Sequence, residues 1–279
     1  MLLSVVIITY NEEANIGRTL ASVQPLVADG KGEIIVVDSG STDRTVEIAK
    51  SYGARVFVEE WKGYAAQKNS AIDKAVGDWL LSLDADEEVD SELSNELMGR
   101  AAEKVPLPES AREWCLTMRQ SNLDLLDGAP VAFLVRRKNF FLERWVQHAG
   151  FWPDAKLRVL RRGAGRFEQR AVHEDISVNG HKKLIPFGAL IHHSYPTLSD
   201  YIEHMNRYSS LGAEMVVAKG KVRFSFINIV LRPLFTFFYN YFFRLGFVDG
   251  REGLLLHLYH AVYVSWKYAK AWELRRNQK

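Results

Sequence analysis

Short apolar runs alternate with amphipathic, capped segments through the first hundred residues, and this alternation restricts the fold more than any other feature. The apolar runs are rich in β-branched residues, as are strands buried on both faces, and the segments between them have helical spacing. The runs are residues 2–9, 33–39, 54–59 and 78–84, and the helical segments are 11–23, 41–53 and 63–77. This order predicts an α/β fold with a Rossmann-like, mostly parallel sheet flanked by helices.

The alternation weakens after residue 105. Residues 112–124, 130–137 and 156–162 have strand-like composition, and 199–220 has the spacing of a helix. The one cysteine, Cys115, allows no intrachain disulfide, which fits a reducing compartment. The N-terminal residues lack the basic start of a signal peptide, and no apolar stretch reaches the roughly 18 residues that cross a bilayer.

Three of the predicted strands run into polar segments, at residues 9–12, 38–41 and 84–86. The carboxyl ends of parallel strands lie at one edge of a sheet, which is where open α/β sheets bind ligands. Each segment alone is explained better by a turn or a helix cap, for example a cap at Ser91 after the last of them. The three together indicate a binding site.

The carboxylates of Asp84 and Asp86 define the chemistry expected there. Residues two apart in extended backbone point the same way, so both carboxylates can face one Mg²⁺ or Mn²⁺, which shares its ligands with phosphates. Neither a GxGxxG nor a GxxxxGK[ST] motif occurs, so a dinucleotide site and a P-loop are not supported. A metal-bound diphosphate is the interpretation that explains this acidic stretch.

The stretches SVVIITYNEEANIGRTLASV, EIIVVDSGSTDRTVEIAKSYGARV and KNSAIDKAVGDWLLSLDADE resemble the nucleotide-sugar-binding half of the family-2 inverting glycosyltransferases with the GT-A fold. Further on, GFWPDAKLRVLRR, AVHED and HHSY resemble a narrower subgroup, the lipopolysaccharide-core β-glucosyltransferases. The resemblance implies a glycosyltransferase domain over 1–198, with a nucleotide-sugar half at 1–100 and an acceptor half at 101–198. Residues 199–279 are expected to form a separate helical region.

The resemblance also implies which residues meet the donor and the metal. Those assigned to the nucleotide-sugar are Thr9, Tyr10, Asn11, Glu12, Asp38, Lys68, Asp84, Ala85 and Asp86. Lys68 is explained equally well as a solvated helix lysine. The DxD pair Asp84 and Asp86 is expected to bind the metal. His192 is a third candidate ligand, although a packed, hydrogen-bonded histidine explains it somewhat better.

On the acceptor side, an inverting transfer needs one base to take the proton from the attacking hydroxyl. By resemblance this base is Glu174, with His173 orienting it or the acceptor. Asp175 and Asp154 are the next candidates, and a polar surface loop at 173–175 is the alternative.

The other acceptor-binding residues expected are Trp152 and Arg158. Arg158, together with Arg161 and Arg162, could meet a phosphorylated acceptor through bidentate hydrogen bonds. The solvated face of a strand explains these three arginines equally well.

The C-terminal region is basic and aromatic. Residues 219–279 carry 11 Lys and Arg against 3 Asp and Glu, a net +8, which leaves −6 for the rest of the chain. Residues 222–248 are apolar almost all round and are followed by residues 253–272. Charges interrupt these segments, and Pro233 breaks or begins a helix. Such segments suit the membrane interface, with a helical layer or an oligomer contact as the alternatives.

Together these features predict a metal-dependent hexosyltransferase at the inner face of the cytoplasmic membrane. It would move a hexose from a UDP-sugar to a lipid-linked saccharide with inversion, in lipopolysaccharide or other cell-envelope glycan synthesis, without a nucleic-acid partner and with homo-oligomerisation left open. One rival is a nucleotidyltransferase, which would usually have a glycine- and basic-rich loop where this chain has the acidic YNEEAN. The other is a non-enzymatic membrane-bound adaptor that retains nucleotide binding.

Overall fold

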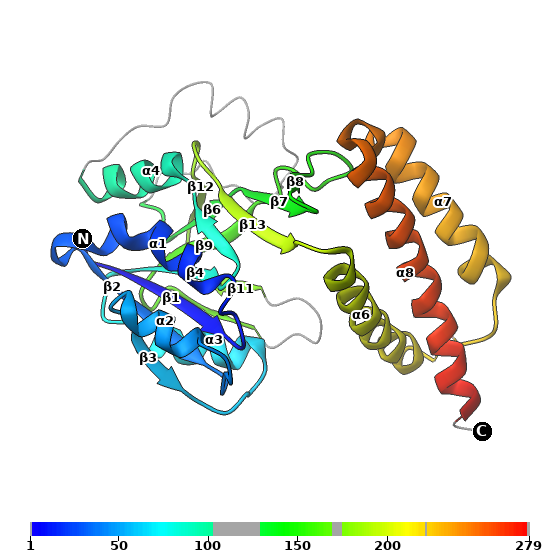
Figure 1. The fold of residues 1–279 in the computed structure, drawn as a ribbon, viewed down its shortest axis with the longest axis horizontal. Helices are drawn as coiled ribbons and strands as arrows, with labels where there is room; N and C mark the ends of the chain where they lie inside the picture. Colours follow the sequence, from blue (N-terminus) through cyan, green and yellow to red (C-terminus); the bar gives the residue numbers. More distant parts are fainter. Residues whose placement is uncertain (1, 103–128, 169–174, 221, 278–279) are drawn as a thin grey trace. The chain divides into compact units, whose positions relative to one another are not determined.

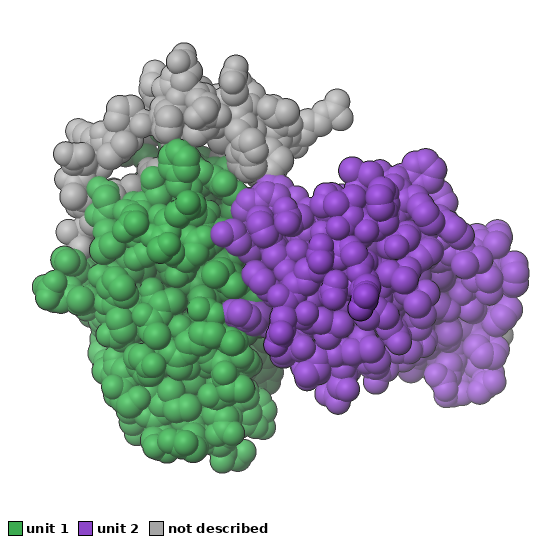
Figure 2. Space-filling view, turned by 45° about the horizontal axis from the view of Figure 1, so that its top comes forward, with its two compact units in different colours: residues 1–137, 154–192 green, residues 138–153, 193–279 purple. Residues whose placement is uncertain are grey.

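The computed structural model describes residues 2–102, 129–168, 175–220 and 222–277. The chain divides into two compact units, coloured separately in Figure 2. Unit 1 comprises residues 1–137 and 154–192, and unit 2 comprises 138–153 and 193–279. The two units are described in turn.

Unit 1 is built on a seven-stranded sheet with the strand order β12-β6-β9-β4-β1-β2-β3. The strands are β1 (Leu3–Thr9), β2 (Gly32–Asp38), β3 (Arg55–Val58), β4 (Trp79–Asp84), β6 (Ala132–Val135), β9 (Lys156–Arg161) and β12 (Lys182–Leu184). Strands β4, β1, β2 and β3 are mutually parallel, as is the β6–β12 pair, whereas β9 runs antiparallel to both β4 and β6. The mostly parallel α/β sheet is therefore confirmed (Figure 1). The strand expected at 112–124 lies outside the described residues.

The helices of unit 1 follow from the pattern that predicted them. They are α1 (Ile16–Val27), α2 (Thr45–Ser51), α3 (Tyr64–Asp73) and α4 (Ser91–Ala102), with a 3₁₀ turn at Ala28–Gly30. Gly53 has φ +75° just after α2, a left-handed position that ends the helix as expected. Helix α4 is capped by Asp90 rather than Ser91, because the Asp90 carboxylate accepts a 2.9 Å hydrogen bond from Leu93 N–H.

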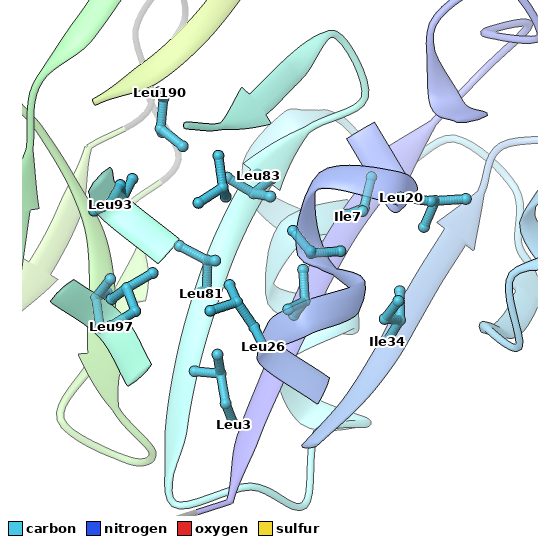
Figure 3. Close-up of a cluster of buried hydrophobic side chains, with 14 of the residues drawn as sticks. Leu3, Ile7, Leu20, Leu26, Ile34, Leu81, Leu83, Leu93, Leu97 and Leu190 are labelled. Atoms are coloured by element: carbon cyan, nitrogen blue, oxygen red, sulfur yellow. The ribbon is translucent and has the colours of Figure 1, made fainter. Parts of the chain in front are cut away.

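Two apolar clusters cover the two faces of the sheet, which explains the unbroken apolar runs. Along β1, Val5 and Ile7 belong to one cluster and Val6 to the other. The first cluster holds the buried stripe of α1, and Figure 3 shows its side chains meeting the strands. The second holds Ala71 and Ile72 of α3. Strands buried on both faces need apolar residues at every position.

Shorter elements complete unit 1. These are β5 (Glu87–Val89), the antiparallel pair β10 (Gly165–Phe167) and β11 (Ile176–Val178), and the first half of β13 (Leu190–Tyr195). Strand β13 pairs antiparallel with β5, with His192 opposite Glu87. This pairing places residues that are about a hundred positions apart in the sequence beside each other.

Unit 2 is mainly helical. It contains most of β7 (Arg137–Phe141), β8 (Arg144–Trp145), α6 (Leu198–Ala218), α7 (Arg232–Phe238) and α8 (Gly250–Asn277), with π-helical turns at Ile227–Leu231 and Tyr239–Phe243 and a 3₁₀ turn at Gly246–Asp249. Helices α6 and α7 both pack on α8, and a small core surrounds Phe141 and Tyr201. The helix expected at 199–220 is confirmed, and Pro233 begins a helix rather than breaking one. None of the helices within the described ranges is long and apolar enough to cross a membrane.

Candidate active site

The three polar strand ends lie at one edge of the sheet, as predicted. In the parallel ladders Thr9 is opposite Asp38, and Ile8 is opposite Asp84. Thr9 Oγ1 and both amide atoms of Gln67, on α3, are buried, and no hydrogen-bond partner for them is found in the described parts of the chain. Buried polar atoms normally have a partner, so these three atoms are an exception in this part of the chain.

The loops after β1 and β2 hold each other. Asn11 Oδ1 accepts a 2.8 Å hydrogen bond from Thr42 N–H, and Glu12 N–H donates at 2.7 Å to Thr45 Oγ1. Asp38 is fully buried, and its Oδ2 accepts from Gly40 and Ser41 N–H at 2.9 and 2.8 Å. Asp38 therefore stabilises the turn after β2, which is one of the two roles that the sequence suggested. The other role, contact with a nucleotide, stays a prediction.

Asp84 lies between two cations at the end of β4. Lys68 Nζ is 2.8 Å from Asp84 Oδ1, and Arg158 Nη2 is 2.7 Å from Asp84 Oδ2. Lys68 is 6% exposed and Arg158 is 5% exposed, so the interpretation of these two residues as solvated was wrong. Arg161 and Arg162, in contrast, are exposed. Burial alone would raise the pKa of Asp84, but Arg158 and Lys68 hold that pKa well below its usual value.

Glu87 and Arg137 form a second ion pair, which contacts Arg158 and so helps to hold it against Asp84. Glu87 is fully buried, and its Oε1 accepts from Arg158 Nη2 at 2.6 Å and from Arg137 Nη1 at 3.3 Å. Arg137 also donates from Nε and Nη2 to Asp154 Oδ2 at 2.9 and 2.7 Å, and Lys156 Nζ lies 3.1 Å from Asp154 Oδ1. Asp154, the reserve candidate for the base, is thus already engaged by two cations.

Sequence reasoning missed Glu87 and Arg137. Glu87 was one of several acids after Asp84, and only its burial beside Arg158 distinguishes it from Glu88. The contact between Glu87 and Arg158 could be recognised only from the pairing of β9, which carries Arg158, with β4.

Asp86 faces a different partner. Its Oδ2 lies 3.3 Å from His192 Nε2, because β5 and β13 pair directly beside it. Glu12 adds a carboxyl group nearby: burial raises its pKa, a hydrogen bond from Asn15 opposes this, and the charge of Asp86 raises it further. Negative charge accumulates here, which favours a bound cation.

This donor set fits a divalent metal that is completed by its substrate. No three His, Cys, Asp or Glu side chains of the described residues form a metal-holding group by themselves. Magnesium-type ions in phosphate-transfer sites are held by one or two carboxylates plus substrate phosphates, so a full protein cage is not required. Asp86 and His192 are therefore the residues that could hold such an ion.

Helix α3 also fastens β10 to the site. Asn69 Nδ2 donates to the Phe167 carbonyl and Asn69 Oδ1 accepts from Phe167 N–H, both at 2.9 Å. Lys68 Nζ lies 5.2 Å from the centre of the Phe167 ring. One helix turn thus contacts both Asp84 and the strand that precedes residues 169–174.

The remaining predicted residues are spread more widely. Glu174 and His173 lie outside the described residues, and Asp175 is exposed. Ala85 is buried, and its carbonyl accepts a 2.6 Å hydrogen bond from Thr19 Oγ1, which fixes the DxD turn to α1. Trp152 belongs to unit 2, where its ring packs edge-on against Trp145 with centroids 5.2 Å apart. The acceptor roles of Trp152, His173 and Arg158 stay predictions.

Comparison with known proteins gives consistent matches. The sequence model of glycosyl transferase family 2 matches residues 4–106. The chain is 30% identical to the lipopolysaccharide core biosynthesis glycosyltransferase LpsC of Rhizobium meliloti, over 97% of this chain and 92% of the relative. It is 31% identical to an uncharacterized glycosyltransferase of Rickettsia typhi, over 98% of this chain and 87% of that protein.

Among solved structures, the fold is similar to that of the mannosyltransferase PcManGT from Pyrobaculum calidifontis, determined in complex with GDP-Man and Mn²⁺. The TM-score is 0.50 at 16% sequence identity, and the match covers 99% of this chain and 75% of that one. A likeness at this identity concerns the fold alone.

Proposed function

The chain belongs to glycosyltransferase family 2, and we propose that it moves a hexose from a UDP-sugar to a lipid-linked saccharide acceptor with inversion. The product would be part of lipopolysaccharide or another cell-envelope glycan. The observation that carries the proposal is the pairing of Asp84 with Lys68 and Arg158 at the carboxyl edge of the sheet, beside Asp86 and His192.

In this proposal Asp84 binds the donor sugar-nucleotide through its ribose. A carboxylate has about four acceptor positions, and Lys68 and Arg158 occupy two of them. The Asp84 side chain keeps 30% of its surface exposed, so it can still accept from a ribose hydroxyl. The two cations hold the carboxylate ionised and in a fixed orientation.

Asp86 and His192 would hold Mg²⁺ or Mn²⁺ together with the donor diphosphate. When bound, the ion neutralises charge on the leaving diphosphate. Neutral His192 is a ligand that suits Mn²⁺ better than Mg²⁺. Glu12 lies close enough to raise the local negative potential without being required as a ligand.

Glu174 is the proposed base. It takes the proton from the acceptor hydroxyl as that oxygen forms a bond to the anomeric carbon, while the bond from this carbon to the diphosphate oxygen breaks on the opposite side. In-line attack of this kind inverts the anomeric centre. The engagement of Asp154 by Arg137 and Lys156 makes Asp154 the poorer candidate.

The donor assignment predicts a metal-dependent stabilisation that Asp86 controls. A panel of UDP-sugars should raise the melting temperature of the wild-type protein in the presence of Mn²⁺, with the true donor giving the largest shift. Asp86→Asn should lose the Mn²⁺-dependent part of that shift because it removes a charged ligand. Asp29→Asn, an exposed acid on the 3₁₀ turn before β2, is the matched control and should behave as wild type.

The same panel separates the rivals. Transfer with release of UDP supports the proposal, whereas transfer of the uridylyl group with release of a sugar 1-phosphate would identify a nucleotidyltransferase. Binding of UDP-sugars without turnover on any lipid-linked saccharide would favour the adaptor. An Asp86→Asn protein that keeps the full Mn²⁺-dependent shift would exclude the metal assignment.

The proposed site of action is the inner face of the cytoplasmic membrane, and the surface of unit 2 supports it. Large apolar side chains are exposed along residues 224–248, and this segment contains no acidic residue. Phe235 is 67% and Phe243 is 80% exposed, and Arg223, Arg232 and Arg244 are exposed among them. Exposed apolar side chains at this density mark an interaction surface, and adjacent arginines suit anionic headgroups.

Membrane docking predicts co-flotation of the full chain with anionic liposomes. The double variant Phe235→Glu/Phe243→Glu should stay with the soluble fraction, because charged side chains oppose insertion into the interface. Phe187→Glu, at a residue of unit 1 that is 48% exposed, is the matched control and should still float. Unchanged flotation of the double variant, with a loss of self-association, would instead identify an oligomer contact.

A further inference from the structure

Glu87 is a buried acid that has no role so far in binding the donor or the metal. It begins β5, three residues after Asp84, and none of its surface is exposed. Taking a carboxylate out of water is costly unless cations and hydrogen bonds compensate. Buried ion pairs can often be replaced by apolar side chains of similar size without loss of stability. Stability alone therefore does not explain this acid, and its contacts indicate a different role.

The first contact of Glu87 holds the backbone of the DxD motif. Glu87 Oε2 accepts a 3.1 Å hydrogen bond from Asp84 N–H, while the carbonyl of Ala85 accepts from Thr19 Oγ1 at 2.6 Å. In the ladder between β5 and β13, the residue opposite Glu87 is His192. Glu87 thus fixes the main chain where the motif begins, and its own strand pairing places the candidate metal ligand His192 beside the motif.

The second contact of Glu87 divides the charge of Arg158. A single nitrogen, Arg158 Nη2, donates to Asp84 Oδ2 at 2.7 Å and to Glu87 Oε1 at 2.6 Å. Arg137 Nη1, 3.3 Å from the same Glu87 oxygen, helps to hold Glu87 in place. A guanidinium that is shared between two carboxylates neutralises each of them only in part.

Partial neutralisation is important because Asp84 also has a second cation. Lys68 Nζ lies 2.8 Å from Asp84 Oδ1, so each oxygen of this carboxylate accepts from one cation. Hydrogen bonds to an ionised acceptor are roughly twice as strong as those between neutral groups. An Asp84 that took the full charge of both cations would therefore be a weaker acceptor for a hydroxyl group. Glu87 takes part of the charge of Arg158 and so leaves negative charge on the exposed part of Asp84.

We propose that Glu87 is a positioning residue of the donor site, which orients Asp84 through its backbone and keeps its carboxylate a strong acceptor by sharing Arg158. This inference rests on the proposed function, since it assumes that Asp84 accepts a hydrogen bond from a ribose hydroxyl of the donor. Glu87 has no exposed surface, so it acts on the donor through Asp84.

The test compares UDP with 2′,3′-dideoxy-UDP, which lacks both ribose hydroxyls, each titrated into the full chain with Mn²⁺. The wild-type protein should prefer UDP by about 10- to 150-fold, the factor that corresponds to a hydrogen bond with a charged acceptor. Glu87→Gln keeps the shape of the side chain and an acceptor for Asp84 N–H but removes the charge. It should lower this preference about 5- to 10-fold by weakening UDP binding, while the affinity for the dideoxy compound stays near the wild-type value.

Two further variants separate charge from shape and supply the control. Glu87→Asp keeps the charge on a shorter side chain and should retain more of the preference than Glu87→Gln. Glu88→Gln makes the same change at the next residue, where the carboxylate lies 3.1 Å from the exposed Arg18, and should keep the full preference. A partly unfolded sample lowers the number of binding sites rather than the ratio of the two affinities, so a loss of stability does not imitate the expected result.

Four results would overturn the inference. A preference that Glu87→Gln leaves unchanged would show that Asp84 does not depend on Glu87. An equal loss of affinity for both compounds would show that Glu87 only maintains the fold of the site. A smaller preference in Glu87→Asp than in Glu87→Gln would show that shape matters rather than shared charge. These three results leave the proposed donor intact, whereas a wild-type protein that binds both compounds equally would also refute the proposed contact between Asp84 and the ribose.

Discussion

Replacing Glu174 with glutamine is expected to lower sugar transfer by about two to four orders of magnitude while UDP-sugar affinity stays near the wild-type value. An acceptor hydroxyl is a poor nucleophile at neutral pH, and a positioned base contributes about 10²- to 10⁴-fold. Glutamine keeps the shape of the side chain but cannot accept the proton. Single-turnover transfer, measured beside a UDP titration, separates this loss from a loss of donor binding.

Asp175→Asn is the matched control, because it removes the adjacent carboxylate, which is exposed in the structure. Its effect on transfer should be much smaller. The reverse ranking would assign the role of base to Asp175. Near-normal transfer by both variants would place the base elsewhere, and Asp154→Asn would then test the remaining candidate despite its contacts with Arg137 and Lys156.

Replacing Arg158 with methionine is expected to lower the free energy of unfolding by about 3–5 kcal/mol, the usual cost of removing one partner from a buried ion pair. The change leaves the carboxylates of Asp84 and Glu87 without the guanidinium that contacts both at 2.7 and 2.6 Å. Chemical denaturation at neutral pH measures the loss. Arg161→Met, three positions further along β9 and exposed, should change the free energy of unfolding by less than about 0.5 kcal/mol.

The pH dependence of this loss has a definite sign. Arg158 and Lys68 depress the pKa of Asp84 in the folded protein, so the stabilisation is present above the ordinary aspartate pKa and is lost as the pH falls through the folded-state pKa. The difference between wild type and Arg158→Met should therefore be largest at neutral pH and shrink in acid. A difference that stays constant down to the acid limit would contradict the electrostatic explanation and indicate a packing defect.

Much of unit 1 could be predicted because its signals are local. The runs around Val5 and Val36 are apolar at successive positions and rich in β-branched residues, as are strands buried on both faces. Once the strands are parallel, Thr9, Asp38 and Asp84 must share one edge. The position of these three residues at one edge of the sheet thus followed from the periodicity of the sequence.

The interior of the site could not be predicted, because it depends on long-range pairing. Arg158 and Glu87 meet only because β9 lies antiparallel beside β4, and His192 reaches Asp86 only through the β5–β13 ladder. Lys68 is on a helix whose buried residues are mostly small or polar, so no strong apolar stripe showed which face is buried. Lys68 and Arg158 could both have been solvated according to the sequence, but in the structure they are buried and contact Asp84.

The central claim is that a nucleoside diphosphate and a divalent metal bind at the carboxyl edge of β1, β2 and β4. The most direct measurement is a crystal structure of the wild-type protein with UDP and Mn²⁺, with anomalous diffraction used to locate manganese. The account predicts a manganese peak in contact with the Asp86 carboxylate and the diphosphate, with the ribose beside Asp84. UDP bound without manganese at Asp86, or bound away from this edge, would contradict it.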